Sequence, residues 1–235
     1  MHNLFVLLRR GARAVFAVAI LGCATPSTAQ IDRITSREAA AGLKAALEKG
    51  SIAAVASLGR TDGFFGNPQV RIPLPESMQR AEKLMRRFGM GSHADELVLT
   101  LNRAAEAAVP EARQLFIDAV RKMTLQDARA ILQGGETAGT AYFRRSTEER
   151  LRSRFLPIVQ RATEKVGLAR QYNRYAEKGV AFGVVAKDDA NLDAYVTEKA
   201  LDGLFLAVGE EEKKIRKDPA AAGTAIIRKV FGALL

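Results

Sequence analysis

The stretch SLGRTDGFFGNPQVRIPLPES, residues 57–77, decides how the helices on either side of it can be joined. It contains two phenylalanines, two leucines, an isoleucine and a valine, so it carries apolar surface that is unfavourable in water. Pro68, Pro73 and Pro75 lack amide donors and prevent a regular helix here. We therefore predict an irregular connector whose apolar side chains are sheltered by a surrounding helical body.

Helical patterns begin on both sides of this connector. On the amino-terminal side, Thr35 and Glu38 have the spacing of a capping box, and Gly59 is a natural helix end. On the carboxyl-terminal side, apolar residues at helical spacing predict a helix that includes Phe88 and ends at Gly89.

Further start signals divide the rest of the chain into helices. Thr124 and Asp127 begin a short one, Ser146 begins a longer one, and Asn191 precedes the longest apolar pattern. Pro157 lies inside the helix that follows Ser146, so we expect a kink or a break there. Asp218-Pro219 is expected to cap the last helix.

Strand signals are weak, although QVRI (69–72) and GVAFGVV (179–185) could pair as a minor ribbon. A further short helix is expected over residues 168–178. The economical fold is all-α, a single multi-helix bundle domain with a Pro-rich apolar loop packed across it. The alternative is two helical lobes that are split near residues 134–146.

The first 29 residues have the three parts of an export signal. Arg9, Arg10 and Arg13 form a basic front, AVFAVAILG (14–22) is too short to span a bilayer, and small residues follow. We expect cleavage before Gln30, which makes residues 1–29 a signal peptide and residues 30–235 a single α-helical domain in the periplasm.

Cys23 offers a different processing route. The sequence ILGC (20–23) resembles a lipoprotein box, and lipidation of Cys23 would anchor the protein to a membrane by its acyl chains. By either route the domain after Gln30 contains no cysteine, so we expect no disulfide and no thiolate metal site in it.

The charge balance points to polyanions. The whole chain carries a formal net charge of +10, and removal of the three signal-peptide arginines from 36 basic residues, against 26 acidic ones, leaves +7. In the envelope such a protein meets anionic lipid headgroups or other envelope polyanions, whereas we expect no nucleic-acid partner. A surface charge that serves solubility alone is the other interpretation.

The sequence lacks the residues that several common catalytic, nucleotide-binding and metal sites require. His93 is the one histidine after the signal, so a zinc site and a Cys-His or Ser-His-Asp arrangement are not expected. Neither a P-loop nor a GxGxxG motif is present. TDGFFGN (61–67) lacks the acidic density of a calcium loop. We predict no metal, no cofactor and no catalytic residue.

Two stretches supply candidate binding residues. The apolar connector could act as a lid over a hydrophobic groove, or it could simply be strapped across the bundle. YFRRSTEER (142–150) places arginines and aromatic residues around the expected helix start at Ser146, whose amino end favours anions. The candidate ligand-binding residues are Phe64, Phe65, Ile72, Leu74, Tyr142, Arg144 and Arg145.

Several blocks in one order resemble a known family. They are SLGRTDGFFGNPQVRIPLPE (57–76), LNRAAEAAVPEA (101–112), MTLQDARAIL (123–132), TAYFRRST (140–147) and VTEKALDGLF (196–205). Together they resemble the bacterial envelope proteins grouped as domain of unknown function 4197, over residues 36 to 233. The resemblance implies an exported, largely helical protein and supplies no catalytic residue.

These observations lead to three hypotheses of function. We prefer an exported, non-catalytic envelope accessory protein that binds an apolar or amphiphilic ligand or a partner helix. The partner would be a hydrophobic ligand, an anionic lipid headgroup or an envelope protein. One alternative is a periplasmic hydrolase that uses paired carboxylates drawn from Asp62, Glu106, Asp127, Asp202 and Glu211. The other is a purely structural or assembly role.

Overall fold

The computed structural model describes residues 35–89, 91–164, 173, 191–221 and 224–232. Within these ranges the regular structure is entirely helical, so the expected all-α class is confirmed. The helices are α1 (Ser36–Leu58), α2 (Glu76–Arg87), α3 (Gly91–Ala108), the 3₁₀ turn η1 (Val109–Glu111), α4 (Ala112–Lys122), α5 (Leu125–Gln133), α6 (Ala138–Thr163), α8 (Leu192–Lys217) and α9 (Ala225–Gly232).

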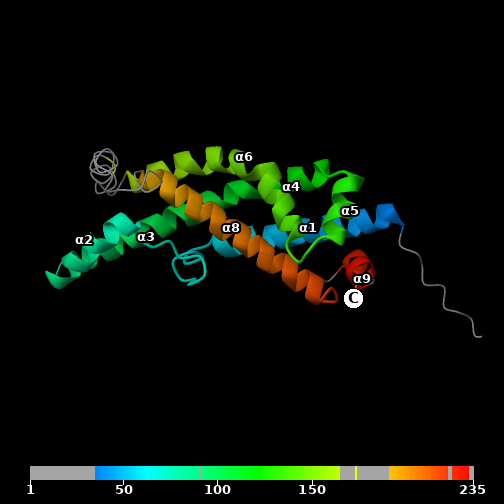
Figure 1. Cartoon of the computed structure of the whole chain (residues 1–235), viewed down its shortest axis with the longest axis horizontal. Coiled ribbons are helices and arrows are strands. Elements are labelled where there is room, and N and C mark those ends of the chain that lie inside the picture. The colour runs from blue at the N-terminus through cyan, green and yellow to red at the C-terminus, as the bar shows by residue number, and fades with distance from the viewer. Residues whose placement is uncertain (1–34, 90, 165–172, 174–190, 222–223, 233–235) are drawn as a thin grey trace, which may run out of the picture. The chain divides into compact units, whose positions relative to one another are not determined.

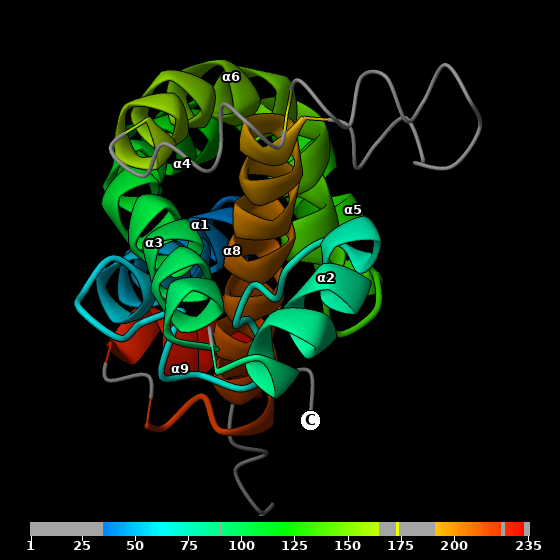
Figure 2. The ribbon, with the colours of Figure 1, turned by 90° about the vertical axis from the view of Figure 1, so that its left-hand side faces the viewer.

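Helix α8 is the element around which the others are arranged. It packs against α6, α1 and α3, while α3 packs against α6. Figure 1 shows α6 and α8 running beside each other, and Figure 2 shows α1, α3 and α6 gathered around α8. Helix α1 also contacts α4, α5 and α9. No helix of the described ranges is both long and apolar enough to span a membrane.

Three phenylalanines join the helices at the centre of the core. The Phe116 ring of α4 lies 4.7 Å, centroid to centroid, from Phe143 of α6 and 6.1 Å from Phe205 of α8. All three side chains are fully or almost fully buried. Aromatic rings at such separations attract one another in addition to the apolar area they bury. This cluster therefore ties α4, α6 and α8 together.

The expected helix starts are found where the local capping signals are strong. The Thr35 and Thr124 hydroxyls each accept a hydrogen bond from the amide of the third residue of their helix, Glu38 and Asp127. The carboxylates of these two acids in turn accept from the amides of Thr35 and Thr124. Asn191 accepts from the amides of the second and third residues after it and begins α8. These predictions rest on local chemistry, and the structure confirms them.

The predicted helix start at Ser146 is wrong, because α6 runs through that position without interruption. The Ser146 hydroxyl donates to the Tyr142 carbonyl, as it does for a serine inside a helix. The helix also continues past Pro157, which is exposed on its outer side, so no break occurs there. The real start of α6 is at Ala138.

The backbone amides at the start of α6 are hydrogen-bonded by a carboxylate that lies far away in the sequence. Glu212 of α8 accepts hydrogen bonds from the amides of Gly139 at 2.9 Å and Thr140 at 2.7 Å. A Cβ atom at Gly139 would lie 2.3 Å from a methyl group of Leu47 and 3.1 Å from a carboxylate oxygen of Glu212, so a side chain here would require Leu47 to move. The charge of Glu212 is balanced by Arg216 at 2.9 Å. The buried carboxylate therefore caps α6 from another helix.

Other expectations differ in detail. Phe88 is 70% exposed and belongs to no core face. QVRI (69–72) forms no strand, and the last helix begins at Ala225, whereas Asp218 ends α8. The expected helix over 168–178 and the run 179–185 lie outside the described residues, apart from Asn173, which donates to Asp193 and accepts from the Leu192 amide.

Candidate functional site

Two open hollows lie side by side along α8. The first, of about 480 Å³, is lined by the segment from Gln69 to Leu74, the start of α2 and one face of α8. The second, of about 400 Å³, is lined by the start of α6 and the next part of α8. Asp202 and Leu206 line both hollows. We call the two together the α8 groove.

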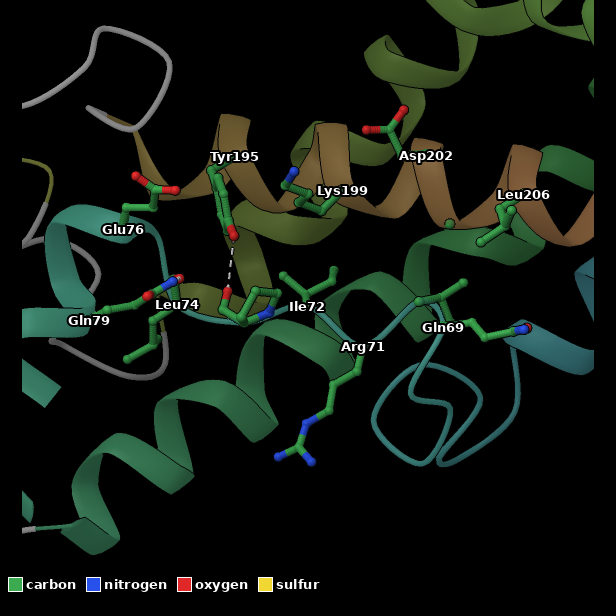
Figure 3. A pocket seen from close by; sticks show the side chains of 13 residues that line it. Gln69, Arg71, Ile72, Leu74, Glu76, Gln79, Tyr195, Lys199, Asp202 and Leu206 are labelled. Carbon is green, nitrogen blue, oxygen red and sulfur yellow. Dashed lines mark hydrogen bonds between the residues drawn. The ribbon is translucent and has the colours of Figure 1, made fainter. Parts of the chain in front are cut away.

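One face of α8 forms the length of this groove. Tyr195, Lys199, Asp202 and Leu206 follow one another at intervals of four, three and four residues, so they share a side of the helix. Figure 3 shows them in a row opposite the residues of the other wall. Leu206 is 43% exposed and is the large apolar side chain that this face presents to solvent.

The opposite wall is formed by residues 69–74, which are part of a longer segment, residues 60–75, that we call the strap. In its extended part Val70, Ile72 and Leu74 are buried, whereas Arg71 and Pro73 between them are exposed. This alternation has the period of an extended chain. Figure 3 shows Arg71 pointing away from α8, and the Tyr195 hydroxyl donates to the Pro73 carbonyl at 3.1 Å.

Asn102 of α3 holds the strap from its other side. Its side-chain oxygen accepts from the Ile72 amide at 2.8 Å, and its side-chain nitrogen donates to the Ile72 carbonyl at 2.9 Å. Asn102 is fully buried. One side chain thus pairs both backbone groups of Ile72, as a neighbouring strand would, and satisfies groups that would be costly to bury alone.

Glu106 holds the start of the strap, one turn along the same helix. One carboxylate oxygen accepts from the amides of Phe64 at 3.0 Å and Phe65 at 3.1 Å, and the other receives Arg103 at 2.6 Å. The hydrogen bond that Arg103 donates to Glu106 raises the pKa of Arg103, so the guanidinium remains charged and neutralises the buried acid.

Small residues let the strap reach its place. Asp62 adopts a positive φ of 63°, which aspartate tolerates better than most residues. A Cβ atom at Gly63 would lie 2.3 Å from the Leu58 carbonyl oxygen, and one at Gly203 of α8 would lie 2.7 Å from the Phe64 ring. The turn therefore depends on the absence of a side chain at Gly63, and the buried position of the Phe64 ring depends on the absence of one at Gly203.

The candidate residues of the connector are mostly core residues. Phe64 is fully buried, and Ile72 and Leu74 are nearly so, although the last two line the floor of the α8 groove. Phe65 is half-buried beneath the Arg71 guanidinium, 4.3 Å from the ring centroid, and does not line the groove. The Phe64 ring fills the space between the strap and Gly203, so a ligand would have to bind in the open groove.

The candidate residues of α6 are not brought together. Tyr142 donates to the Ala119 carbonyl at 2.9 Å, and burial raises the pKa of its hydroxyl. Arg144 lines the second hollow, where it bonds Glu148 and Asp202 and lies 4.6 Å from the centroid of the Phe205 ring. Arg145 is exposed and lines neither hollow, and Cys23 lies outside the described residues.

The carboxylates of the hydrolase alternative already have partners. Asp62 and Glu106 both bond Arg103, and neither lines the α8 groove. The remaining three lie in separate places: Asp127 accepts from the Thr124 amide and hydroxyl, Asp202 bonds Arg144, and Glu211 bonds Lys214. No cluster of three or more histidine, cysteine or acidic residues suited to a metal occurs in the described part of the chain.

Sequence reasoning missed the α8 face altogether. A usable signal was the run Leu204-Phe205-Leu206, because one face of a helix cannot bury three successive large residues. Leu204 and Phe205 are buried and Leu206 is left exposed. Asn102 was missed because its partner, Ile72, is 30 residues away.

These features define a class of protein: an all-α unit with an open groove along one helix, whose buried polar side chains hold backbone amides. The family model described as a protein of unknown function, DUF4197, matches residues 33–232. The chain therefore belongs to the DUF4197 family. Comparison with curated proteins and with solved structures gives no match.

Proposed function

We propose that this protein acts by binding: it is an exported, non-catalytic accessory protein of the bacterial envelope that receives an amphipathic helix of a partner in the α8 groove. The observation that carries the proposal is the exposed Leu206 at the point shared by the two hollows. Leu206 lines the first hollow together with Val70, Ile72 and Leu74, and apolar residues gathered in a groove favour a partner that covers them.

The spacing along α8 favours a helical partner. Tyr195, Lys199, Asp202, Leu206, Gly209 and Lys213 follow at alternating intervals of four and three residues, which is the repeat of helices that pack along one seam. From Tyr195 to Lys213 this seam measures about 27 Å, or about five turns. A partner helix of that length could lie along it.

The charges of the seam describe the partner more closely. Leu206 calls for an apolar residue opposite it, and Lys199 favours an acidic one, whereas Asp202 and Lys213 already bond Arg144 and Glu210. The partner is therefore an amphipathic helix that carries an acidic residue about two turns from the apolar residue that covers Leu206. This pattern supports a specific protein partner over a plain hydrocarbon chain.

The strap argues against the addition of an extended peptide. Strand addition needs a row of available backbone amides. Pro73 and Pro75 have none, and the amides of Arg71 and Ile72 are already bonded to Asn67 and Asn102. The wall therefore offers side chains and not a backbone edge to an incoming segment.

Export is part of the proposal and rests on the sequence of the first 29 residues. Their basic and apolar parts resemble a secretory signal, and Cys23 provides a second, lipid-anchored route. The net charge of +7 after removal of the signal suits a protein that works near anionic membranes.

The test is photo-crosslinking in intact cells with a photoreactive amino acid at position 206 of the full chain. We expect one discrete protein adduct, and we expect the same partner from positions 199 and 213. The crosslinked residues of the partner should recur at intervals of three and four, as on a helix. Leu125, a leucine of α5 that is 55% exposed and outside the groove, is the matched control position.

Equal adducts at positions 206 and 125 would refute the proposal. A lipid adduct at position 206 would replace the partner helix by an amphiphilic ligand as the occupant of the groove. The variant Leu206→Glu should abolish the adducts from positions 199 and 213, whereas Leu125→Glu should leave them unchanged.

A further inference from the structure

A third hollow, away from the α8 groove, combines apolar surface with two arginines. It has a volume of about 310 Å³ and lies where the end of α1 meets the start of α4. Ile52 and Val55 of α1 and Pro110 of η1 supply apolar surface, and Arg60 and Arg113 supply the charge. No carboxylate lines this hollow. We call it the α1–α4 hollow.

Its two arginines differ from the arginines that are held by carboxylates. Arg86, Arg103 and Arg152 each bond two carboxylates. The guanidinium groups of Arg60 and Arg113, by contrast, form no ion pair or hydrogen bond with another described residue. They are both exposed and they come from different elements. Their donors are therefore available to an incoming oxyanion, for which the planar guanidinium is well suited.

The shape of the hollow depends on Gly59. A Cβ atom at this position would lie 2.9 Å from the Val55 carbonyl oxygen and 3.2 Å from the Pro110 ring. Its φ of −78° is available to any residue, so the need for glycine here is one of space. The glycine brings Pro110 close to the end of α1 and keeps the side of the hollow free of a side chain.

We infer that the α1–α4 hollow binds an anionic amphiphile, that is, an oxyanion joined to a hydrocarbon chain. The carboxylate or phosphate would be held by Arg60 and Arg113, and the first part of the chain would lie on Ile52, Val55 and Pro110. This inference is independent of the proposed function, because it uses no residue of the α8 groove.

The inference also replaces the arginines expected from the sequence. Arg144 is bonded to Glu148 and Asp202, so its donors are largely occupied, and Arg145 lines none of the three hollows. In the α1–α4 hollow, charge and apolar surface occur together, as an amphiphile requires. The ligand chemistry fits a free fatty-acid-type anion and a lipid headgroup equally, so the experiment must separate the two.

The experiment measures binding to the full chain by calorimetry and by vesicle sedimentation. The probes are decanoate, decanol, inorganic phosphate, and vesicles of phosphatidylglycerol or of phosphatidylcholine. The variant Arg60→Ala/Arg113→Ala is compared with Arg129→Ala/Arg150→Ala, which removes two exposed arginines that line none of the three hollows. Thermal unfolding checks that both variants are folded.

We expect decanoate to bind at least tenfold more tightly than decanol or inorganic phosphate, because a hydrogen bond to a charged group and apolar burial both contribute. The Arg60→Ala/Arg113→Ala variant should lose about tenfold or more in affinity, and the control variant should lose little. Ile52→Asn should weaken the binding of decanoate without changing that of phosphate.

Loss of decanoate binding in the variant supports a free amphiphile as the ligand. Loss of phosphatidylglycerol binding with decanoate unaffected supports a lipid headgroup. Equal binding by both arginine variants would overturn the inference, and so would phosphate binding as tightly as decanoate. Because the α8 groove is untouched, neither result bears on the crosslinking test.

Discussion

Asn102 and Glu106 show how single side chains can replace a missing strand. The strap is too irregular to satisfy its own backbone, and both residues reach it from consecutive turns of α3. Among the described residues no buried side-chain polar atom lacks a partner. An amide side chain suits this task well, because it can donate and accept at once.

Replacement of Asn102 by leucine should therefore be costly. The variant Asn102→Leu leaves the buried amide and carbonyl of Ile72 without partners, at about 1–3 kcal/mol for each group. We expect the free energy of unfolding to fall by about 2–6 kcal/mol in urea titrations. Gln114→Ala, which alters an exposed amide on α4, should change it by less than about 0.5 kcal/mol. A loss below about 1 kcal/mol for Asn102→Leu would contradict this account.

The residues that hold the strap could not be recognised from the sequence. A glutamate inside a helix, such as Glu106, carries no mark that its partners are 41 and 42 residues away. The same holds for Glu212, which caps a helix that begins more than 70 residues earlier. By contrast, the burial of Phe64, Ile72 and Leu74 followed from the cost of exposing apolar surface.

At the scale of helices, local caps and distant caps behave differently. Thr35 and Thr124 lie within four residues of their partners, so the sequence alone was enough to predict α1 and α5. Ser146 has the same local pattern, but α6 extends on both sides of it because Phe143 and Thr147 are buried against neighbouring helices. Tertiary packing outweighed the capping preference at that position.

The cap of α1 predicts a dependence on pH. The Thr35 amide and hydroxyl both donate to Glu38 and lower the pKa of its carboxyl from 4.5 to about 2. Since the folded pKa is depressed, the stabilisation is complete above the ordinary value and is lost as the pH falls towards 2. The difference in melting temperature between the wild type and Glu38→Gln should therefore shrink between pH 4.5 and pH 2.

The carboxyl of Glu38 can also be followed directly by NMR titration. We expect its midpoint to rise in Thr35→Ala, because the hydroxyl donor is removed. In the Thr35→Ala background the pH dependence caused by Glu38→Gln should become smaller. A midpoint at the ordinary value in the wild type would show that the capping box does not form in solution.

For the molecule as a whole, the Phe116 cluster should dominate stability. Phe116→Ala removes the ring that contacts both Phe143 and Phe205, and so weakens the joint between α4, α6 and α8. We expect a loss of about 3–5 kcal/mol in the free energy of unfolding, measured with guanidinium. The matched variant Phe88→Ala, at a site that is 70% exposed, should cost less than about 0.5 kcal/mol. Similar losses for the two would refute the central role of the cluster.

The all-α architecture was accessible from the sequence because helical periodicity and caps repeat along the chain. The α8 groove was not, since it needs Gln69 to Leu74 and Tyr195 to Leu206 to lie on opposite walls. No local pattern states that two segments more than 120 residues apart will meet. The α1–α4 hollow is hidden for the same reason, because Arg60 and Arg113 belong to different elements.

The strap also has a consequence for the order in which the protein can be made. Helix α8 supplies the last contacts of the strap: Gly203 faces the Phe64 ring, and Tyr195 bonds Pro73, which lies 122 residues earlier in the chain. During synthesis Phe64 therefore emerges long before the helix that covers it. Until α8 has been made, the nascent chain exposes this apolar turn, which favours aggregation. We therefore expect the unfolded chain to bind a chaperone that holds chains unfolded.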